Sequence, residues 1–122
     1  MKLLHFVILS LLLCLPAQAQ EIEYGTGLVC DTRQQAEDLV RHFDGDMDAA
    51  LRAVNVEAHD PSACAIMTIA FVRGPEVATA RSKDATFQVV RILVVGVGTS
   101  NGFQSVVPAA YVSLFQIREY AV

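Results

Sequence analysis

The spacing of apolar residues changes from a helical to an extended period near Cys64. Before this residue, apolar side chains recur three and four positions apart, which indicates short amphipathic helices. After it they form continuous runs, of which Thr86–Gly98 is the longest. This run is rich in Val and Ile, whose β-branched side chains favour an extended backbone. Because only Gln88 and Arg91 interrupt its apolar content, we expect most of both faces of this strand to be covered.

Two short helices are predicted from the helical spacing. Either Asp31 or Thr32 can cap the first, since each is followed three positions later by a glutamine that completes a capping box. Asp44 and Gly45 are expected to end this helix, and the second begins near Asp46. The residues of the two apolar faces are Ala36, Leu39, Val40 and Phe43, then Met47, Ala50, Leu51 and Val54.

The rest of the chain is predicted to be an extended lead-in, Gln20–Val29, and a series of strands. Arg73–Pro75 is expected to end the first strand, whereas Asn101-Gly102 signals a hairpin. Pro108 is expected to end the strand after that hairpin, with a 3₁₀ turn at 109–111. The predicted strands are Ala65–Val72, Val77–Ala80, Thr86–Gly98, Phe103–Val107 and Val112–Tyr120. We predict an α+β fold: two short N-terminal helices packed on a small, mainly antiparallel β-barrel or curled sheet.

Residues 1–19 have the pattern of a secretory signal peptide. Lys2 gives a positive start, Phe6–Leu15 is an apolar run, and Ala17–Ala19 is an A-x-A cleavage site. Cleavage would leave residues 20–122 as a single domain in the periplasm or outside the cell. Two alternatives are a retained membrane anchor and a lipoprotein acylated at Cys14, although a lipobox requires a small residue where Leu13 stands.

The charge of the chain is acidic. It carries 13 acidic and nine basic residues, a net charge of −4, and loss of Lys2 with the leader makes the mature chain one unit more negative. Nucleic acid and anionic membrane surfaces are therefore not expected as partners. No segment after the leader is long and apolar enough to be expected to span a membrane.

After cleavage two cysteines remain, Cys30 and Cys64. An even pair in an exported protein predicts a disulfide, here between the start of the first helix and the start of the β region. The alternatives are two buried free thiols and a zinc site. Zinc is disfavoured because neither cysteine has a second ligand at suitable spacing, and only His42 and His59 supply imidazole nitrogens. We expect no metal and no cofactor.

Two motifs resemble functional sites but occur in the wrong context. Gly98–Gly102 matches the G-x-S-x-G nucleophile elbow, yet a strand follows it and no histidine comes after Ser100. Asp44–Asp48 resembles the start of a calcium loop, but Ala49 and Asn55 stand where Gly and Glu are required. We interpret these segments as a hairpin turn and a helix–helix junction, and His42 and His59 as surface residues.

Four residues are candidates for ligand binding: Arg73, Arg91, Phe103 and Tyr111. The two arginines are unusual because they interrupt or end apolar strands. Arg91 is expected either to form an ion pair with an acid such as Glu76 or Glu119, or to line a binding groove. Phe103 and Tyr111 lie near predicted loops, where flat aromatic side chains often contribute to interfaces.

Two resemblances are carried by short motifs. Asn101–Leu114 is similar to the end of a bacterial SH3-like domain, with its hairpin, strand, aromatic 3₁₀ turn and final strand. The mature chain also resembles small exported proteins of alpha-proteobacteria, in the order of Cys30–Thr32, Ala63–Cys64 and Phe87–Val90. These resemblances imply an SH3-like arrangement of the strands and export as a single fold, and they imply no activity.

The sequence favours a non-catalytic binding or accessory module at the cell envelope, with an envelope peptide, glycan or protein as its partner. The alternative is a small secreted enzyme or enzyme inhibitor. An enzyme requires a convergent set of acid, base or nucleophile, and no such set is indicated by spacing. The expected recognition loops are Arg81–Asp84 and Thr99–Gly102, at the ends of the strands.

Export with cleavage after Ala19 can be tested by the intact mass of the protein recovered from the periplasm. We expect a mass corresponding to a chain that begins at Gln20, because the A-x-A site directly precedes this residue. A recovered protein that retains Met1 would show that the leader is not removed.

Overall fold

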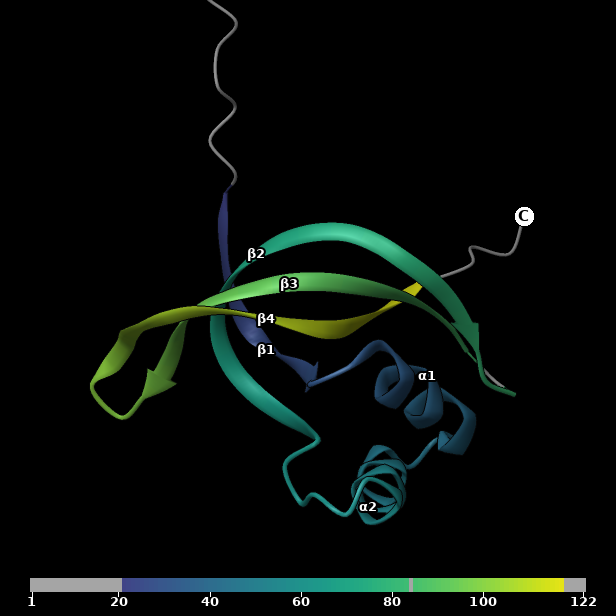
Figure 1. Cartoon of the computed structure of the whole chain (residues 1–122). Helices are drawn as coiled ribbons and strands as arrows, with labels where there is room; N and C mark the ends of the chain where they lie inside the picture. The colour runs from purple at the N-terminus through teal and green to yellow at the C-terminus, as the bar shows by residue number, and fades with distance from the viewer. Residues whose placement is uncertain (1–20, 84, 118–122) are drawn as a thin grey trace, which may run out of the picture.

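The structure is a computed structural model that describes residues 21–83 and 85–117. The chain order of its elements is strand, two helices, then three strands (Figure 1). Their bounds are β1 Ile22–Cys30, α1 Arg33–His42, α2 Met47–Glu57, β2 Cys64–Arg81, β3 Thr86–Thr99 and β4 Gly102–Ile117. The helices therefore lie between β1 and β2, and the prediction that they precede the whole sheet was wrong.

The segment predicted as a lead-in is strand β1. It pairs with β2 at every residue from Ile22↔Val72 to Cys30↔Cys64. Gly25 and Gly27 weaken its intrinsic preference for strand, so the local sequence gives little sign of it. Pairing with a distant segment supplies the stabilisation that local preference lacks.

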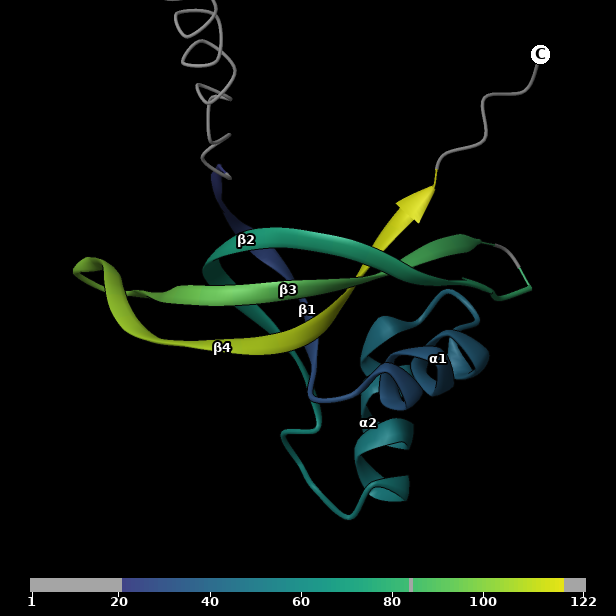
Figure 2. The same cartoon turned by 45° about the horizontal axis from the view of Figure 1, so that its top comes forward.

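The four strands form one antiparallel sheet that curls on itself. The neighbours are β1-β2, β2-β3 and β3-β4. The order closes because the end of β1 also pairs with β4, at Val29↔Ser113 and Cys30↔Val112. The hairpin predicted at Asn101-Gly102 is confirmed: Thr99 pairs with Gly102, whose positive φ of 104° suits glycine. Figure 2 shows both helices on one side of the sheet, away from this hairpin.

Strands β2 and β4 continue through the prolines that were expected to end them. The ladder between β2 and β3 shifts register between Arg73 and Glu76, so the Gly74-Pro75 segment bulges. A Cβ on Gly74 would lie 2.8 Å from the carbonyl oxygen of Arg91, and only glycine fits there. In β4 the register shift between Val94 and Gly96 accommodates Val106–Pro108 in a second bulge. Bulges admit proline because they interrupt the hydrogen-bond ladder.

Two further predictions fall in this part of the chain. The segment 109–111, expected to form a 3₁₀ turn, belongs to strand β4. The last predicted strand is part of the same element, which ends at Ile117 in the described residues. Tyr120 lies outside them.

The sheet separates two hydrophobic clusters. One faces the helices and is made of Leu28, Cys30, Ala36, Leu39, Ala50, Val54, Cys64, Val89 and Val112. The other is the interior cluster, made of Val29, Ile69, Phe71, Val90, Ile92 and Val94, with Tyr111 and Phe115 packed against it. Neighbouring residues such as Val89 and Val90 belong to different clusters because side chains alternate across a strand. Arg91 and Leu93, on the same face of β3 as Val89, are exposed. The prediction that most of both faces are covered therefore holds for the interior face and for Val89, and is wrong for Arg91 and Leu93.

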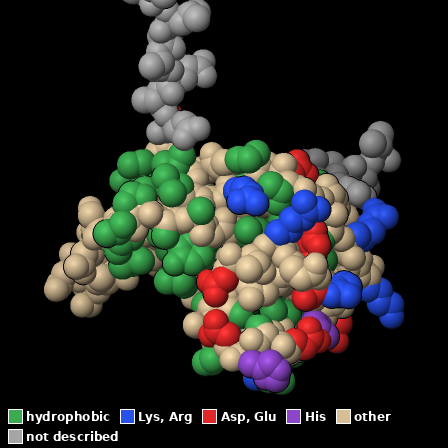
Figure 3. Space-filling model, viewed as in Figure 1, with side chains coloured by type: hydrophobic (Ala, Val, Ile, Leu, Met, Phe, Trp, Pro, Cys, Tyr) green, Lys and Arg blue, Asp and Glu red, His purple; other side chains and the backbone are tan. Residues whose placement is uncertain are grey.

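Charged and apolar side chains occupy different parts of the surface. In the view of Figure 3, hydrophobic side chains gather on the side where β1 begins, whereas most charged side chains lie over the other side and the helices. Large apolar residues that remain exposed include Ile22, Tyr24, Leu93 and Phe103. Tyr24 and Phe103 meet edge to face, with ring centroids 5.0 Å apart.

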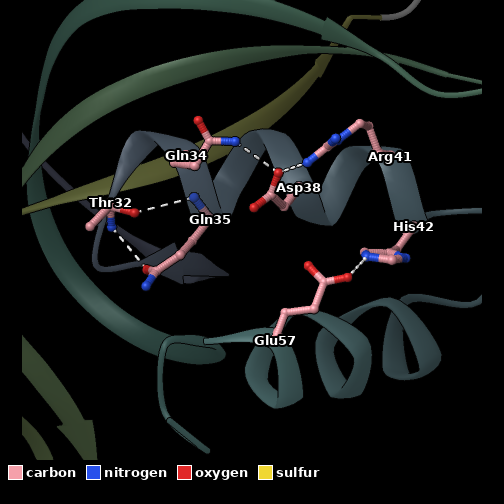
Figure 4. Close-up of polar contacts among 7 residues, drawn as sticks. All are labelled: Thr32, Gln34, Gln35, Asp38, Arg41, His42 and Glu57. Atoms are coloured by element: carbon pink, nitrogen blue, oxygen red, sulfur yellow. Dashed lines mark hydrogen bonds and ion pairs between the residues drawn. The ribbon is translucent and has the colours of Figure 1, made fainter. Parts of the chain in front are cut away.

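Polar contacts fix the ends of the helices (Figure 4). Thr32 is the N-cap of α1: its hydroxyl accepts from the Gln35 N–H, and the Gln35 side chain accepts from the Thr32 N–H. Of the two candidate caps, the structure selects Thr32. Asp46 caps α2 by accepting from the Ala49 N–H. A contact of 2.6 Å between His42 Nε2 and Glu57 Oε1 then joins the two helices.

The helical segment is fastened at its base by the predicted disulfide. The sulfur atoms of Cys30 and Cys64 are bonded, and both residues are buried. They are also direct cross-strand partners, so the disulfide joins the points where the chain leaves the sheet and returns to it. Asn55 of α2 supports this junction, because its side chain accepts from the Cys64 N–H and donates to the Cys64 carbonyl.

Replacing both cysteines, Cys30→Ala with Cys64→Ala, should lower the free energy of unfolding by about 3–4 kcal/mol. The physical reason is that the disulfide restricts the unfolded chain across a separation of 34 residues. Urea unfolding of the oxidised protein and the double variant measures the difference. Equal midpoints and slopes for the two proteins would contradict this role.

Candidate ligand-binding groove

The closure between β1 and β4 is short, and we call it the seam. It consists of two residue pairs, Val29↔Ser113 and Cys30↔Val112. At the next position the Ser113 hydroxyl donates to the Leu28 carbonyl oxygen at 2.5 Å. A side chain thus takes the place of a backbone donor where the ladder stops. In the described residues, the rest of β1 pairs with β2 alone.

An apolar groove of about 370 Å³ opens on one side of the seam. Its lining is mostly aliphatic, with Asp31, Ser62 and Tyr111 as the residues that carry polar side-chain groups. The full lining is Val29, Asp31, Ser62, Ala65, Met67, Ile69, Val94, Val97, Val106, Val107, Ala109 and Tyr111. A volume in this range suits part of a ligand such as two or three side chains of a peptide.

The alternation of side chains along three strands brings these residues together. Met67 and Ile69 are two positions apart on β2, and Ile69 pairs with Val97 of β3, so their side chains share one face. The bulge at Val106–Pro108 forms part of the rim, where Val107 is 87% exposed. Met67 and Val106, which also line the groove, are exposed as well, and a contiguous exposed apolar patch is typical of an interaction site.

A second cleft, the slot, opens on the other side of the seam. It has a volume of about 260 Å³ and lies between Glu23–Gly27 on β1 and Ser113–Gln116 on β4. Ile69 and Phe71 also line it, and Ile69 is shared with the groove. The two cavities are therefore neighbouring openings along one incompletely paired edge.

An ion pair lies beside the slot. Arg73 donates from Nε and Nη2 to the two carboxylate oxygens of Glu23, each at 3.1 Å. Its guanidinium also lies 3.9 Å from the centre of the Phe115 ring, a cation–π contact. Both charged groups are partly exposed. Arg73 does not itself line the slot, but the two residues that orient it, Glu23 and Phe115, do.

The four residues predicted to bind a ligand do not form one site. Tyr111 lines the groove, and Arg73 lies at the slot. Phe103 pairs with Gly98 of β3, one position beyond the groove residue Val97, and so lies on the opposite face of the sheet. Arg91 is also on the opposite face, between Val90 and Ile92 of the interior cluster.

Arg91 does not pair with the described acid that was expected to bind it. Glu76 instead accepts from the Thr79 hydroxyl and from the Gln88 amide. Glu119, the other candidate, lies outside the described residues, as does Asp84 of the predicted loop Arg81–Asp84. Arg91 is exposed on β3, opposite Val112.

His42 and His59 lie away from the groove, whose titratable side chains are Asp31 and Tyr111. Within residues 21–83 and 85–117, no group of three His, Cys, Asp or Glu side chains is arranged to hold a metal ion. His42 contacts Glu57, and His59 lies with Arg52 and Asp60 at a different surface hollow. The arrangement at the groove can hold apolar groups and supply a few hydrogen bonds at its rim.

Comparisons with known proteins found no match to this chain. No family model matches it, and neither a curated protein nor a solved structure is significantly similar. In the part of the chain that the structure describes, no helix is long and apolar enough to cross a membrane.

Most of the groove was missed by sequence reasoning. Met67 and Val97 appeared there as ordinary strand residues, and Val107 as the end of a strand. The signal that could have indicated a groove is the apolar Val106-Val107 pair directly before Pro108, because a proline inside an apolar run marks a bulge or an edge. The opposite wall of the groove, on β2, has no comparable signal in the local sequence.

Tyr111→Ala and Phe103→Ala should differ in their effects on stability. Tyr111 packs against the interior cluster, so its truncation is expected to lower the free energy of unfolding by about 1–3 kcal/mol, less than for a fully buried aromatic residue. Phe103 is 47% exposed, and its truncation should cost less than about 1 kcal/mol. Chemical denaturation of both variants tests this order. A larger loss of unfolding free energy for Phe103→Ala than for Tyr111→Ala would contradict the placement of Tyr111 against the interior cluster and of Phe103 on the exposed opposite face.

Proposed function

We propose that this chain is an exported, non-catalytic binding module that holds an apolar peptide segment of a partner protein at the cell envelope. The observation that carries the proposal is the apolar groove beside the seam, with exposed Val107 at its rim. Open, apolar and only sparsely polar hollows suit the recognition of apolar side chains.

The chemistry of the groove favours a peptide over a glycan. A glycan presents many hydroxyl groups, and each needs a partner when it leaves water. The groove offers Asp31, Ser62 and Tyr111 as its polar side chains, against nine aliphatic or methionine residues. An extended peptide can place apolar side chains in the groove and keep its polar groups at the rim.

Two features support export to the periplasm or the cell exterior. The leader at residues 1–19 has the three parts of a secretory signal. The buried disulfide between Cys30 and Cys64 closes the helical segment and is typical of proteins that fold in an oxidising compartment. Together they favour the cell envelope as the place where the partner is met.

The proposal can be tested by selecting ligands from a displayed library of seven-residue peptides with the protein purified from the periplasm. We expect enrichment of sequences with apolar residues at alternate positions, because such a peptide presents them on one face. A library that yields no binder above background would count against the proposal.

A pair of variants locates the binding site. Ala109→Phe fills the groove, since Ala109 lines it, and should weaken binding of a selected peptide at least about tenfold, which corresponds to about 1.4 kcal/mol. Ala110→Phe is the matched control, because Ala110 is exposed on the opposite face of β4. Calorimetric titration should show that this control binds the peptide with near-normal affinity. Equal losses of peptide affinity in both variants would argue against the groove as the binding site.

A further inference from the structure

We infer that the slot between β1 and β4 receives an extended strand of the partner polypeptide, which completes the hydrogen bonding of the sheet. This inference rests on the proposed binding function and specifies how the partner is held. It is carried by the backbone edges that form the slot, by two glycines of β1 and by the charges around it.

The two long walls of the slot are residues of β1 and β4 that do not pair with each other. Continuing the seam register would place Leu28 opposite Leu114 and Gly27 opposite Phe115. The described residues show neither pair, and a cleft of about 260 Å³ separates the two strands instead. Edge strands expose N–H and C=O groups at regular spacing, and another extended chain is the ligand that matches this spacing. The slot offers such an edge on both sides.

Gly25 and Gly27 lie on the slot side of β1. Gly25 pairs with Ile69 and Gly27 with Met67, whose side chains face the two cavities, so a Cβ on either glycine would point the same way. Such a Cβ would meet nothing within 4 Å, and neither glycine has a positive φ. Nothing in the fold of this strand requires glycine, although glycine weakens a strand interior. Close approach of another backbone is a reason for glycine there.

The charges beside the slot indicate the character of the strand that fills it. Arg73 is neutralised by Glu23. Glu21 is exposed next to β1, and it makes no ion pair with another described residue. The chain as a whole carries a net charge of −4. A partner strand with apolar residues at alternate positions and Lys or Arg near its end complements this surface.

A direct test uses a selected seven-residue peptide and its counterpart N-methylated at alternate residues. N-methylation removes backbone donors but keeps every side chain, so strand pairing predicts at least a tenfold loss of affinity for the methylated peptide. The backbone N–H and C=O groups of a strand alternate in direction, and the Leu28 carbonyl points to Ser113 of β4, so the Thr26 backbone faces the slot. NMR of the labelled protein should therefore show a shift of the Thr26 amide signal on addition of the unmodified peptide. Equal affinity of the two peptides, or an unmoved Thr26 amide, would overturn the inference.

Gly25→Val tests the slot from the protein side. The valine side chain is expected to occupy the slot and to weaken peptide binding at least tenfold, with a melting temperature no lower than that of the original protein. Thr68→Val is the matched control, because Thr68 lies on the opposite face of β2 from Ile69 and lines neither the groove nor the slot. Thr68→Val should bind the peptide normally. A Gly25→Val protein that is folded and binds the peptide with unchanged affinity would rule out the slot as the site of strand pairing.

The outcomes separate this inference from the proposed function. If Ala109→Phe abolishes binding and Gly25→Val leaves it unchanged, the groove binds a peptide without strand pairing, and the inference alone fails. If neither variant affects binding, both fail. Sedimentation of the unliganded protein covers a further outcome: a dimer that dissociates in Gly25→Val would show that a second copy fills the slot, which also overturns the assignment to a partner polypeptide.

Discussion

Cys30 connects the disulfide, the closure of the sheet and the hydrophobic cluster that faces the helices. Its sulfur is bonded to Cys64, its backbone lies between Cys64 and Val112 in the sheet, and its buried side chain belongs to the cluster that faces the helices. The disulfide therefore does more than restrict the conformations of the unfolded chain. It holds the helical segment at the same point where β1 meets β4 and the order of strands closes.

This concentration of contacts leaves the rest of the seam open. Because the closure is confined to Val29–Cys30 and Val112–Ser113, the hydrophobic interior is accessible on both sides of it. The groove and the slot are the two resulting openings, and Ile69 contributes to both. The helices support the opposite face of the sheet, so a ligand can bind at the seam without displacing the cluster around Cys30. A rigid scaffold with an incompletely paired edge is well suited to recognition.

The bulges determine the shape of this edge. Gly74-Pro75 in β2 and Val106–Pro108 in β4 each interrupt a ladder without ending the strand. Long strands with bulges can bend sharply, which lets four strands curl until the first and last meet. The same bulge in β4 exposes Val107 at the groove. One local irregularity thus contributes both to the curvature of the fold and to the surface proposed to bind the partner.

The sequence by itself determined the features that depend on local chemistry: the two amphipathic helices, the Asn101-Gly102 hairpin, the apolar β3 segment and, through an even count after the predicted leader, the Cys30–Cys64 disulfide. Of the candidate site it indicated Tyr111 and Arg73, but it did not separate them from Phe103 and Arg91, which lie on the other face. Tertiary structure alone decided that Ile22–Cys30 is a strand, that two prolines lie within strands, and that the seam stays short. The reason is that side-chain periodicity records how each segment is buried, whereas strand pairing depends on segments far apart in the chain.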